Sequence, residues 1–404
     1  MGRAKAEMME DDARGWSEPD GHVCADCVED EYLKDVIRGH ANERHCDYCG
    51  RQTKAFSAAP VVVLMEPIAD AVFHYFNDPT QAGVPYESGE GGWTEPLVGT
   101  HEMLGTIGLY CHDDLFEDIA DAFIYTEWVR ASDGHWLGSR QSEELSALWD
   151  GFVDVIKHEV RFFFQHPSAV KPTKPREADP QSILITLEDM VKNFGLLDRL
   201  KAEISLFRVR ERNDGADWEI NSDQMGAPPP ERARAGRMNP AGISYLYLAF
   251  EPETALAEVL SGPPCTAAIA RFTTQREVQV LDLSKLPPEP SIFDEAKRDE
   301  RESLLFLEQF VSEISQPVRK DGREHVGYVP SQVVCEYFAL VFQISPEHHL
   351  DGIVYPSAVR PGGRNLVLFP TERGFERRFD QIEFGGAWEQ AYANWTNLTE
   401  ALNT

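Results

Sequence analysis

The sequence predicts an α+β protein in which a helical N-terminal domain precedes a mixed α+β domain. Three observations lead to this class. Apolar and aromatic residues recur at helical spacing between residues 56 and 165. From residue 204 onward the apolar residues instead form short β-type runs with helical stretches between them. At 404 residues the chain is also too long for one ordinary hydrophobic core, so more than one domain is expected.

The composition favours a folded protein and argues against two classes of partner. Hydrophobic residues make up 42% of the chain, which is enough to build substantial cores. The 68 acidic residues outnumber the 38 basic ones, which gives a formal net charge of −30. Because Arg and Lys are scattered along the chain, this charge should repel nucleic acid and anionic membranes.

The sequence shows no pattern typical of secretion or membrane insertion. The N-terminal stretch has no apolar run, so we expect neither a signal peptide nor a membrane anchor, and residues 1–20 are predicted to be flexible. The most apolar windows, Val61–Met65 and Tyr337–Ile344, are too short to span a bilayer. Seven cysteines without a secretory signal indicate a reducing compartment, and we expect a cytoplasmic protein.

Residues 21–55 hold two Cys-x-x-Cys pairs with eighteen residues between them. Each pair can direct two thiolates to one side of a tight turn, and two pairs complete a tetrahedral metal site. Gly50, directly after the second pair, supplies backbone freedom that such turns use. A redox-active pair is the alternative, but two pairs at this spacing favour structural Zn²⁺. The predicted ligands are Cys24, Cys27, Cys46 and Cys49.

Residues 56–180 are predicted to form a helical domain and a linker. The clearest helix is Ser142–Phe164, in which apolar residues fall on one face at steps of three and four. Residues 167–180 carry four prolines among charged residues, a composition typical of a linker.

Residues 181–375 are predicted to form the mixed α+β domain, and residues 376–404 a C-terminal tail. Helices are expected over Ser182–Glu203, Asp294–Ile314 and Ser331–Phe342. The predicted strands are Ile204–Val209, Tyr245–Phe250, Ala267–Thr273, Val278–Leu283, Gly352–Tyr355 and Leu366–Phe369.

The stretch RMNPAGISYLYLAFEPETALAEV, residues 237–259, places polar side chains around an otherwise apolar strand. Arg237 stands at the mouth of a Gly/Pro-rich loop, where its guanidinium can pair bidentately with phosphate or carboxylate. Arg208 lies in the preceding predicted strand. Glu258 lies in an apolar helix, where a carboxylate is costly unless it is paired or used. Together with Tyr247 in the strand, these residues indicate a pocket for a phosphorylated ligand.

The segment from Leu206 onward resembles the RES-domain family, named for its Arg, Glu and Ser. The family pattern has an Arg in the first strand, then Gly-Arg-x-Asn-Pro-x-Gly, Leu-Tyr-x-Ala and Thr-Ala-x-Ala-Glu. This chain matches it with Arg208, Gly236-Arg237-Met238-Asn239-Pro240-Ala241-Gly242, Leu246-Tyr247-Leu248-Ala249 and Thr254-Ala255-Leu256-Ala257-Glu258. Met238 replaces the more usual aromatic residue. The family Ser falls on Ser357, followed by Asn365, and Ser331 is a competing candidate.

The resemblance implies an enzyme that consumes NAD⁺ on a fold similar to that of diphtheria-type ADP-ribosyltransferases. RES domains are known as toxins that cleave the nicotinamide–ribose bond by hydrolysis or phosphorolysis, so inorganic phosphate is a second expected small molecule. The implied catalytic residues are Glu258, Arg237 and Tyr247. The residues implied to bind NAD⁺ are Arg208, Arg237, Tyr247, Ser357 and Asn365. A toxin or defence effector of this kind implies an antitoxin or trigger protein encoded elsewhere, and we expect a homo-oligomer.

Three alternatives remain open at this stage. The enzyme could transfer ADP-ribose to a macromolecule rather than to water or phosphate. The N-terminal half is similar to the HEPN-like domain that accompanies some RES domains, and Arg161 and His166 fit the Arg-x4-His spacing of HEPN ribonucleases. The acidic charge and the three Phe residues inside that motif argue against RNA cleavage. The N-terminal half could instead sense a trigger or form oligomers.

Overall fold

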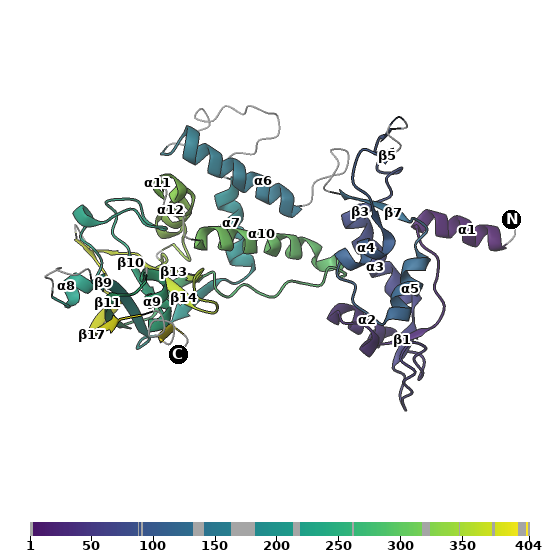
Figure 1. The fold of residues 1–404 in the computed structure, drawn as a ribbon, viewed down its shortest axis with the longest axis horizontal. Coiled ribbons are helices and arrows are strands. Elements are labelled where there is room, and N and C mark those ends of the chain that lie inside the picture. The colour runs from purple at the N-terminus through teal and green to yellow at the C-terminus, as the bar shows by residue number, and fades with distance from the viewer. Residues whose placement is uncertain are drawn as a thin grey trace. The chain divides into compact units, whose positions relative to one another are not determined.

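A computed structural model gives the fold of the chain in two compact units (Figure 1). It describes residues 3–87, 89, 92–131, 141–162, 182–212, 219–260, 262–316, 324–346, 348–373, 376–394 and 401–402. The first unit comprises Met1–Glu144 and Pro288–Leu305, and the second comprises Leu145–Pro287 and Phe306–Thr404. The chain therefore passes between the units three times, and helix α10 (Arg298–Ser315) contributes to both.

The first unit is mainly helical, as the sequence predicts. Its helices are α1 (Arg3–Arg14), α2 (Glu31–His40), α3 (Val62–Tyr75), α4 (Thr100–Thr106) and α5 (Asp113–Ala122). Its short strands are β1 (His22–Cys24) paired with β2 (Ala58–Pro60), β3 (Phe76–Asn77) and β6 (Val98–Gly99) on either side of β7 (Glu127–Arg130), and β4 (Tyr86–Glu87) paired with β5 (Gly92–Trp93). Residues 3–14, which we expected to be flexible, form a helix.

One apolar core joins the first unit, and a distant segment of the chain completes it. Leu33, Leu64 and Trp128 are fully buried in this core together with Phe293, from the segment Pro288–Leu305. Glu302 of the same segment is buried and accepts hydrogen bonds from the hydroxyl groups of Tyr75, at 2.7 Å, and Ser142. These bonds satisfy a carboxylate that would otherwise destabilise the interior.

The second unit is built on an eight-stranded sheet with the order β17-β11-β9-β10-β14-β13-β12-β8 (Figure 1). Neighbouring strands are antiparallel except β12 and β13, which are parallel. The strands are β8 (Leu197–Leu200), β9 (Ser205–Arg212), β10 (Leu246–Ala249), β11 (Cys265–Thr274), β12 (Val278–Asp282), β13 (Gly352–Pro356), β14 (Arg364–Leu368) and β17 (Ile382–Tyr392). A separate hairpin pairs β15 (Thr371–Arg373) with β16 (Glu376–Arg378).

Helices cover one face of this sheet. The core on that face contains Trp149 of α6 (Gln141–Asp154), Leu187 of α7 (Ser182–Asn193), Phe310 of α10 and Val334 of α12 (Val329–Glu336), packed with strand residues such as Ile353. α6 and α12 each continue into a π-turn, Val155–Glu159 and Tyr337–Val341 respectively. The shorter helices are α8 (Ser222–Met225), α9 (Pro252–Val259) and α11 (Glu324–Gly327). None of the helices in the described ranges has the length and apolarity needed to cross a bilayer.

The predicted α+β class is confirmed, and each predicted strand is present within two or three residues of its predicted ends. Two predicted helices are too long: Ser142–Phe164 ends with its π-turn at Glu159, and Ser182–Glu203 ends at Asn193. Gly195 adopts a positive φ of 63°, which stops the helix, and Leu197–Leu200 then pairs with β12 as an edge strand. The segment 376–404, predicted to be a tail, supplies β17 to the main sheet, where it pairs along β11.

Candidate active site

A pocket opens where strands β9 and β10 lose their pairing. The two strands are joined at a single residue pair, Phe207 with Ala249. Just beyond that pair lie Arg208 on β9 and Leu248 on β10, and both line the pocket, which has a volume of about 260 Å³. We call it the carboxylate pocket. Its lining residues are Phe207, Arg208, Val209, Arg237, Tyr247, Leu248, Ala249, Ala255, Glu258, Val259, Tyr328, Tyr355 and Asn365.

Helix α9 brings Glu258 to this pocket, where two side chains hold its carboxylate. Oε1 of Glu258 accepts hydrogen bonds from Ser357 Oγ at 2.8 Å and from Asn365 Nδ2 at 2.6 Å. Oε2 has no hydrogen-bond partner among the described residues. The carboxylate is therefore fixed through one oxygen, while the other remains available to a ligand.

The sheet positions the two donors. Asn365 on β14 lies opposite Ala249 on β10 and Tyr355 on β13, so its buried side chain shares the face of the sheet that Ala249 and Tyr355 occupy. Ser357 directly follows β13, and its hydroxyl oxygen also accepts backbone N–H groups of Val359 and Arg360, at 3.3 and 3.1 Å. One hydroxyl thus orders a turn and orients the carboxylate.

Several hydrogen bonds fix the conformation of the loop that carries Arg237. Tyr247 accepts a hydrogen bond from the Met238 N–H at 3.0 Å and donates one to Asn239 Oδ1 at 2.7 Å. Asn239 Nδ2 donates to three backbone carbonyl oxygens of the same loop. A Cβ atom on Gly236 would lie 2.6 Å from Asn239 Oδ1, so only glycine fits there. The predicted motif is thus a rigid loop that presents Arg237.

Helix α12 completes this support. Ser331 Oγ donates to the carbonyl oxygen of Arg237 at 2.5 Å, and Gln332 Nε2 donates to the carbonyls of Gly236 and Asn239 at 2.8 and 2.9 Å. The two candidate serines therefore both contact the site, Ser357 through the carboxylate and Ser331 through the arginine loop.

Two guanidinium groups line the pocket, those of Arg208 and Arg237, and neither has a carboxylate partner among the described residues. Nη1 of Arg208 is buried and has no hydrogen-bond partner within the described part of the chain. Burial lowers the pKa of Arg208, and the charge of Arg210 lowers it further. The Arg237 guanidinium lies 5.8 Å from the ring centroid of Tyr355. Since Arg stays protonated in proteins, this arrangement favours an anionic ligand.

Tyrosines line the pocket, and the sequence reasoning found only one of them. Tyr247 was predicted to contact the nucleotide, but its hydroxyl group is engaged by the Arg237 loop, and burial raises its pKa well above the ordinary value. Tyr355 and Tyr328 were not predicted. Burial and the charge of Glu258 raise the pKa of Tyr355, while Arg237 opposes the shift. The Tyr-Pro-Ser order at 355–357 was a usable signal, since it places an aromatic ring two residues before Ser357.

The four predicted zinc ligands come together in the first unit. Their sulfur atoms all lie within 4.8 Å of one another, with Cys24–Cys49, Cys27–Cys46 and Cys24–Cys27 separations of 3.5, 3.6 and 3.7 Å. Tetrahedral Zn–S bonds of about 2.3 Å place the sulfurs roughly 3.8 Å apart, so the donor set fits Zn²⁺. Gly50 has the positive φ expected after the second pair, 68°.

The structure does not test the alternative ribonuclease motif. Arg161 is exposed, and His166 lies outside the described residues.

The second unit is thus an α+β domain whose pocket holds a positioned carboxylate and two guanidinium groups that have no carboxylate partner among the described residues. The family description "HEPN/RES N-terminal domain 1" matches residues 39–170, and "RES domain" matches residues 205–389. Residues 39–170 therefore resemble a HEPN/RES N-terminal domain and residues 205–389 resemble a RES domain, as the sequence predicts.

Among solved structures, the chain is similar to one from the M. tuberculosis MbcT–MbcA toxin–antitoxin complex. The similarity covers 54% of this chain and 98% of that chain, at 14% identity and a TM-score of 0.29. No curated protein matches the sequence.

Proposed function

We propose that the second unit cleaves the bond between nicotinamide and ribose in NAD⁺. The RES domain match supports an NAD⁺-consuming role in general. The observation that carries the finer proposal is the carboxylate pocket, in which Glu258 is held through one oxygen and, within the described ranges, Arg208 and Arg237 lack carboxylate partners. When neutral nicotinamide leaves, positive charge develops on the ribose beside an anionic pyrophosphate, so the reaction needs a carboxylate for the first and guanidinium groups for the second.

The chemistry follows from charge development in the transition state. As the C1–N bond breaks, its electron pair leaves with nicotinamide, and positive charge grows on the ribose ring. The free Oε2 of Glu258 stabilises that charge and orients the ribose hydroxyl groups or the incoming nucleophile. Water then forms the new C1–O bond and releases a proton, giving ADP-ribose and nicotinamide. If phosphate attacks instead, the product is ADP-ribose 1″-phosphate.

The arginines and tyrosines serve binding. Arg208 and Arg237 pair with the pyrophosphate or an incoming phosphate through charge-assisted hydrogen bonds. Tyr355 and Tyr328 provide aromatic surface for the nicotinamide ring. Ser357 and Asn365 are positioning residues in this scheme, because their contacts are to Glu258.

The product identifies the acceptor. Purified protein is incubated with NAD⁺ with and without phosphate, and the products are analysed by mass spectrometry. Free ADP-ribose indicates hydrolysis, ADP-ribose 1″-phosphate indicates phosphorolysis, and a modified macromolecule in a lysate indicates transfer. Intact NAD⁺ under all conditions would contradict the proposal.

The catalytic role of Glu258 is tested with two matched variants on helix α9. Glu258→Gln keeps the shape of the side chain but removes the charge, and we expect kcat to fall at least about a hundredfold with KM little changed. Glu253→Gln, one turn earlier on α9 and outside the pocket lining, is the control and should leave kcat unchanged. A Glu258→Gln enzyme with near-normal kcat would exclude Glu258 as the catalytic carboxylate.

A toxin role is the biological part of the proposal, because unregulated NAD⁺ cleavage harms the cell that makes the enzyme. Expression in a bacterium should arrest growth, and Glu258→Gln should relieve the arrest. An antitoxin encoded elsewhere, or the first unit itself, would control the activity. Equal growth arrest by wild type and Glu258→Gln would contradict the toxin role by this route.

A further inference from the structure

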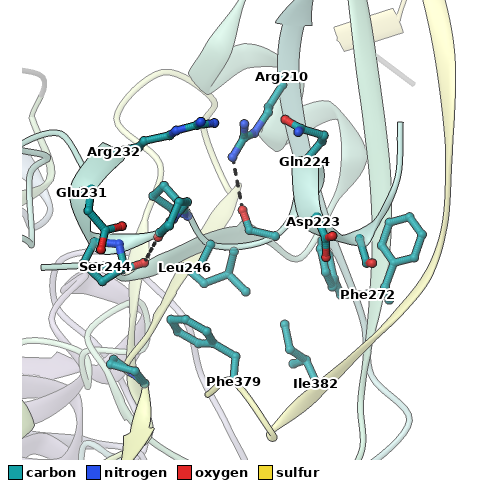
Figure 2. A pocket seen from close by; sticks show the side chains of 18 residues that line it. Arg210, Asp223, Gln224, Glu231, Arg232, Ser244, Leu246, Phe272, Phe379 and Ile382 are labelled. Atoms are coloured by element: carbon teal, nitrogen blue, oxygen red, sulfur yellow. Dashed lines mark hydrogen bonds between the residues drawn. The ribbon is translucent and has the colours of Figure 1, made fainter. Parts of the chain in front are cut away.

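Two further pockets of the second unit differ in the balance of their charged side chains. The larger one has a volume of about 1270 Å³ (Figure 2). Among its described lining residues, Arg210 and Arg232 are offset by Asp223 and Glu231, so it favours neither an anionic nor a cationic ligand. The other pocket has a volume of about 620 Å³, and carboxylates dominate its charged lining. We call it the acidic pocket.

The acidic pocket lies at the far ends of strands that also reach the carboxylate pocket. Three of its lining residues flank β10, β14 and β13 at one end, namely Tyr245, Phe369 and Asp351. Toward their other ends, the same three strands contribute Ala249, Asn365 and Tyr355 to the carboxylate pocket. The two pockets are therefore separate sites at opposite ends of the strands.

The guanidinium group in the lining of the acidic pocket is already paired. Arg276 donates two hydrogen bonds to the carboxylate of Asp351, from Nη1 at 2.9 Å and from Nη2 at 2.7 Å, and lies 3.7 Å from Asp380. The bonds to Asp351 raise the pKa of Arg276. An anionic ligand would have to displace Asp351 to reach this guanidinium group, so an anion is not the expected occupant.

Two other carboxylates in the lining have no such partner. Glu336, the last residue of α12, is half-buried, and its carboxylate makes no hydrogen bond or ion pair within the described ranges. Burial raises the pKa of Glu336. The carboxylate of Glu277 is exposed and equally unpaired in that part of the chain. With His counted as neutral, three carboxylates face one guanidinium group, and a cationic ligand would offset the excess negative charge.

A buried amide oxygen in the lining is a further acceptor. Gln381 is 1% exposed, and its Nε2 donates to the carbonyl oxygen of Phe369 at 2.9 Å and to Oδ1 of Asp351 at 3.5 Å. These two acceptors fix the orientation of the amide. Oε1 then has no donor among the described residues. Because a buried acceptor without a donor is costly, a ligand N–H group that reaches Oε1 stabilises the complex.

Apolar side chains form the walls between these acceptors. Ile243, Ala339 and Leu340 line the pocket, and Leu340 is 64% exposed. Pockets for small ligands measure about 300–1,000 Å³, a range that includes the acidic pocket. We infer that this pocket binds a small aliphatic dication, such as a diamine or agmatine. One charged end pairs with Glu336, the other with Glu277, and the methylene chain lies along Leu340.

Calorimetry on the full chain tests the inference with agmatine, which has a guanidinium group at one end and an ammonium group at the other. Glu336→Gln should weaken agmatine binding at least about tenfold, because it removes a charge-assisted hydrogen bond. Glu277→Gln, at an exposed residue, should weaken it about threefold or more, and it remains informative if Glu336→Gln fails to fold. 4-Guanidinobutyrate, which has a carboxylate in place of the ammonium end, should bind at least about tenfold more weakly than agmatine.

Glu308→Gln is the matched control, because Glu308 is exposed on α10 and outside the pocket lining. It removes the same charge and should leave agmatine binding unchanged, which separates the pocket from general attraction to a chain of net charge −30. Thermal melting checks the fold of each variant. Equal agmatine affinity in Glu336→Gln and Glu308→Gln, or equal affinity for 4-guanidinobutyrate, would overturn the inference. So would the absence of binding by agmatine and putrescine up to about 10 mM.

Discussion

Glu258 carries both of its hydrogen bonds on one oxygen, and this asymmetry separates positioning residues from binding residues. Ser357 and Asn365 donate to Oε1 and so fix the direction of Oε2. Arg208 and Arg237 do not position Glu258, because neither contacts a carboxylate in the described part of the chain. Substitutions in the two groups should therefore change different kinetic constants.

Removing a positioning donor should lower kcat. Ser357→Ala and Asn365→Ala each delete a hydrogen bond to a charged group, and we expect kcat to fall about tenfold with KM within twofold. The double variant should cost less than the sum of the single effects, since both donors act on one atom. Ser345→Ala, which loses only a hydrogen bond to His348 outside the pocket, is the control. A raised KM with normal kcat for Ser357→Ala would show that Ser357 contacts the substrate instead.

Removing an arginine should raise KM. Arg237→Gln and Arg208→Gln each remove a charge-assisted contact to the diphosphate of roughly 1.5–3 kcal/mol, which corresponds to about a ten- to hundredfold increase in KM. kcat should change little if the contact is equal in the ground and transition states. Steady-state kinetics on NAD⁺ decide this, and a fall in kcat at constant KM would assign the arginines to the cleavage step.

The sequence could indicate Arg208, Arg237, Tyr247 and Glu258, because they lie in local patterns where a polar residue interrupts an apolar run. It could not indicate Tyr328 or the clamp made by Gln332. These residues reach the pocket only through tertiary packing of α12, and their own surroundings in sequence resemble ordinary helix positions.

At the scale of elements, α12 acts as a clamp on the arginine loop. Gln332 is buried and donates to two backbone carbonyl groups of that loop, those of Gly236 and Asn239. A helix that packs in the core on one side thus holds a functional loop on the other.

Breaking the clamp should affect stability and binding together. Gln332→Met keeps the length of the side chain but leaves the carbonyl oxygen of Gly236 without its donor and removes one of the two donors to the carbonyl oxygen of Asn239, and we expect a loss of about 1–3 kcal/mol in the free energy of unfolding. KM for NAD⁺ should rise as Arg237 loses its fixed position. Urea unfolding and kinetics measure the two effects. Gln309→Met on the exposed face of α10 is the control, and equal effects from both variants would contradict the clamp.

Elements differ in how far sequence can predict them. The strands of the sheet were predictable because β-branched and apolar runs stand between turn residues. The end of α7 was not, because Leu196, Leu197 and Leu200 continue its apolar pattern, and only pairing with β12 makes 197–200 a strand. β17 was missed because its exposed residues give an edge strand a polar composition.

At the scale of the whole molecule, the division into units does not follow the chain. From Leu145 onward, α6 and its π-turn belong to the second unit, where Leu145, Trp149, Phe152 and Ile156 are buried in the core. A sequence boundary at 181 therefore cuts through a folded unit.

Truncation of the chain should show that α6 is needed for the stability of the second unit. A chain of residues 141–404 should unfold cooperatively, whereas one of residues 181–404 should not, because it lacks four large core side chains worth roughly 2–5 kcal/mol each. Both chains contain the segment 288–305, so they differ only in α6 and the residues after it. Thermal unfolding and size-exclusion chromatography compare them, and equal stability would contradict the placement of α6.

The cysteine site should matter only to the first unit. We expect about one zinc per chain by metal analysis, lost in Cys46→Ser, since four thiolates complete the coordination sphere. Loss of the metal should lower the melting temperature of the first unit and leave kcat on NAD⁺ within about twofold. Cys111→Ser, outside the cluster, is the control. Unchanged metal content in Cys46→Ser would exclude the site.

The contacts to Glu258 also set when the enzyme can first act during translation. Its two donors follow it by 99 and 107 residues. At about 5–20 residues per second, a ribosome needs roughly 5–20 s to add them. Throughout that interval the nascent chain carries a carboxylate that nothing holds, beside strands that have not yet paired. Under the proposed function, every round of synthesis therefore includes a delay before the chain can cleave NAD⁺, and the proposed antitoxin can bind the chain during that delay.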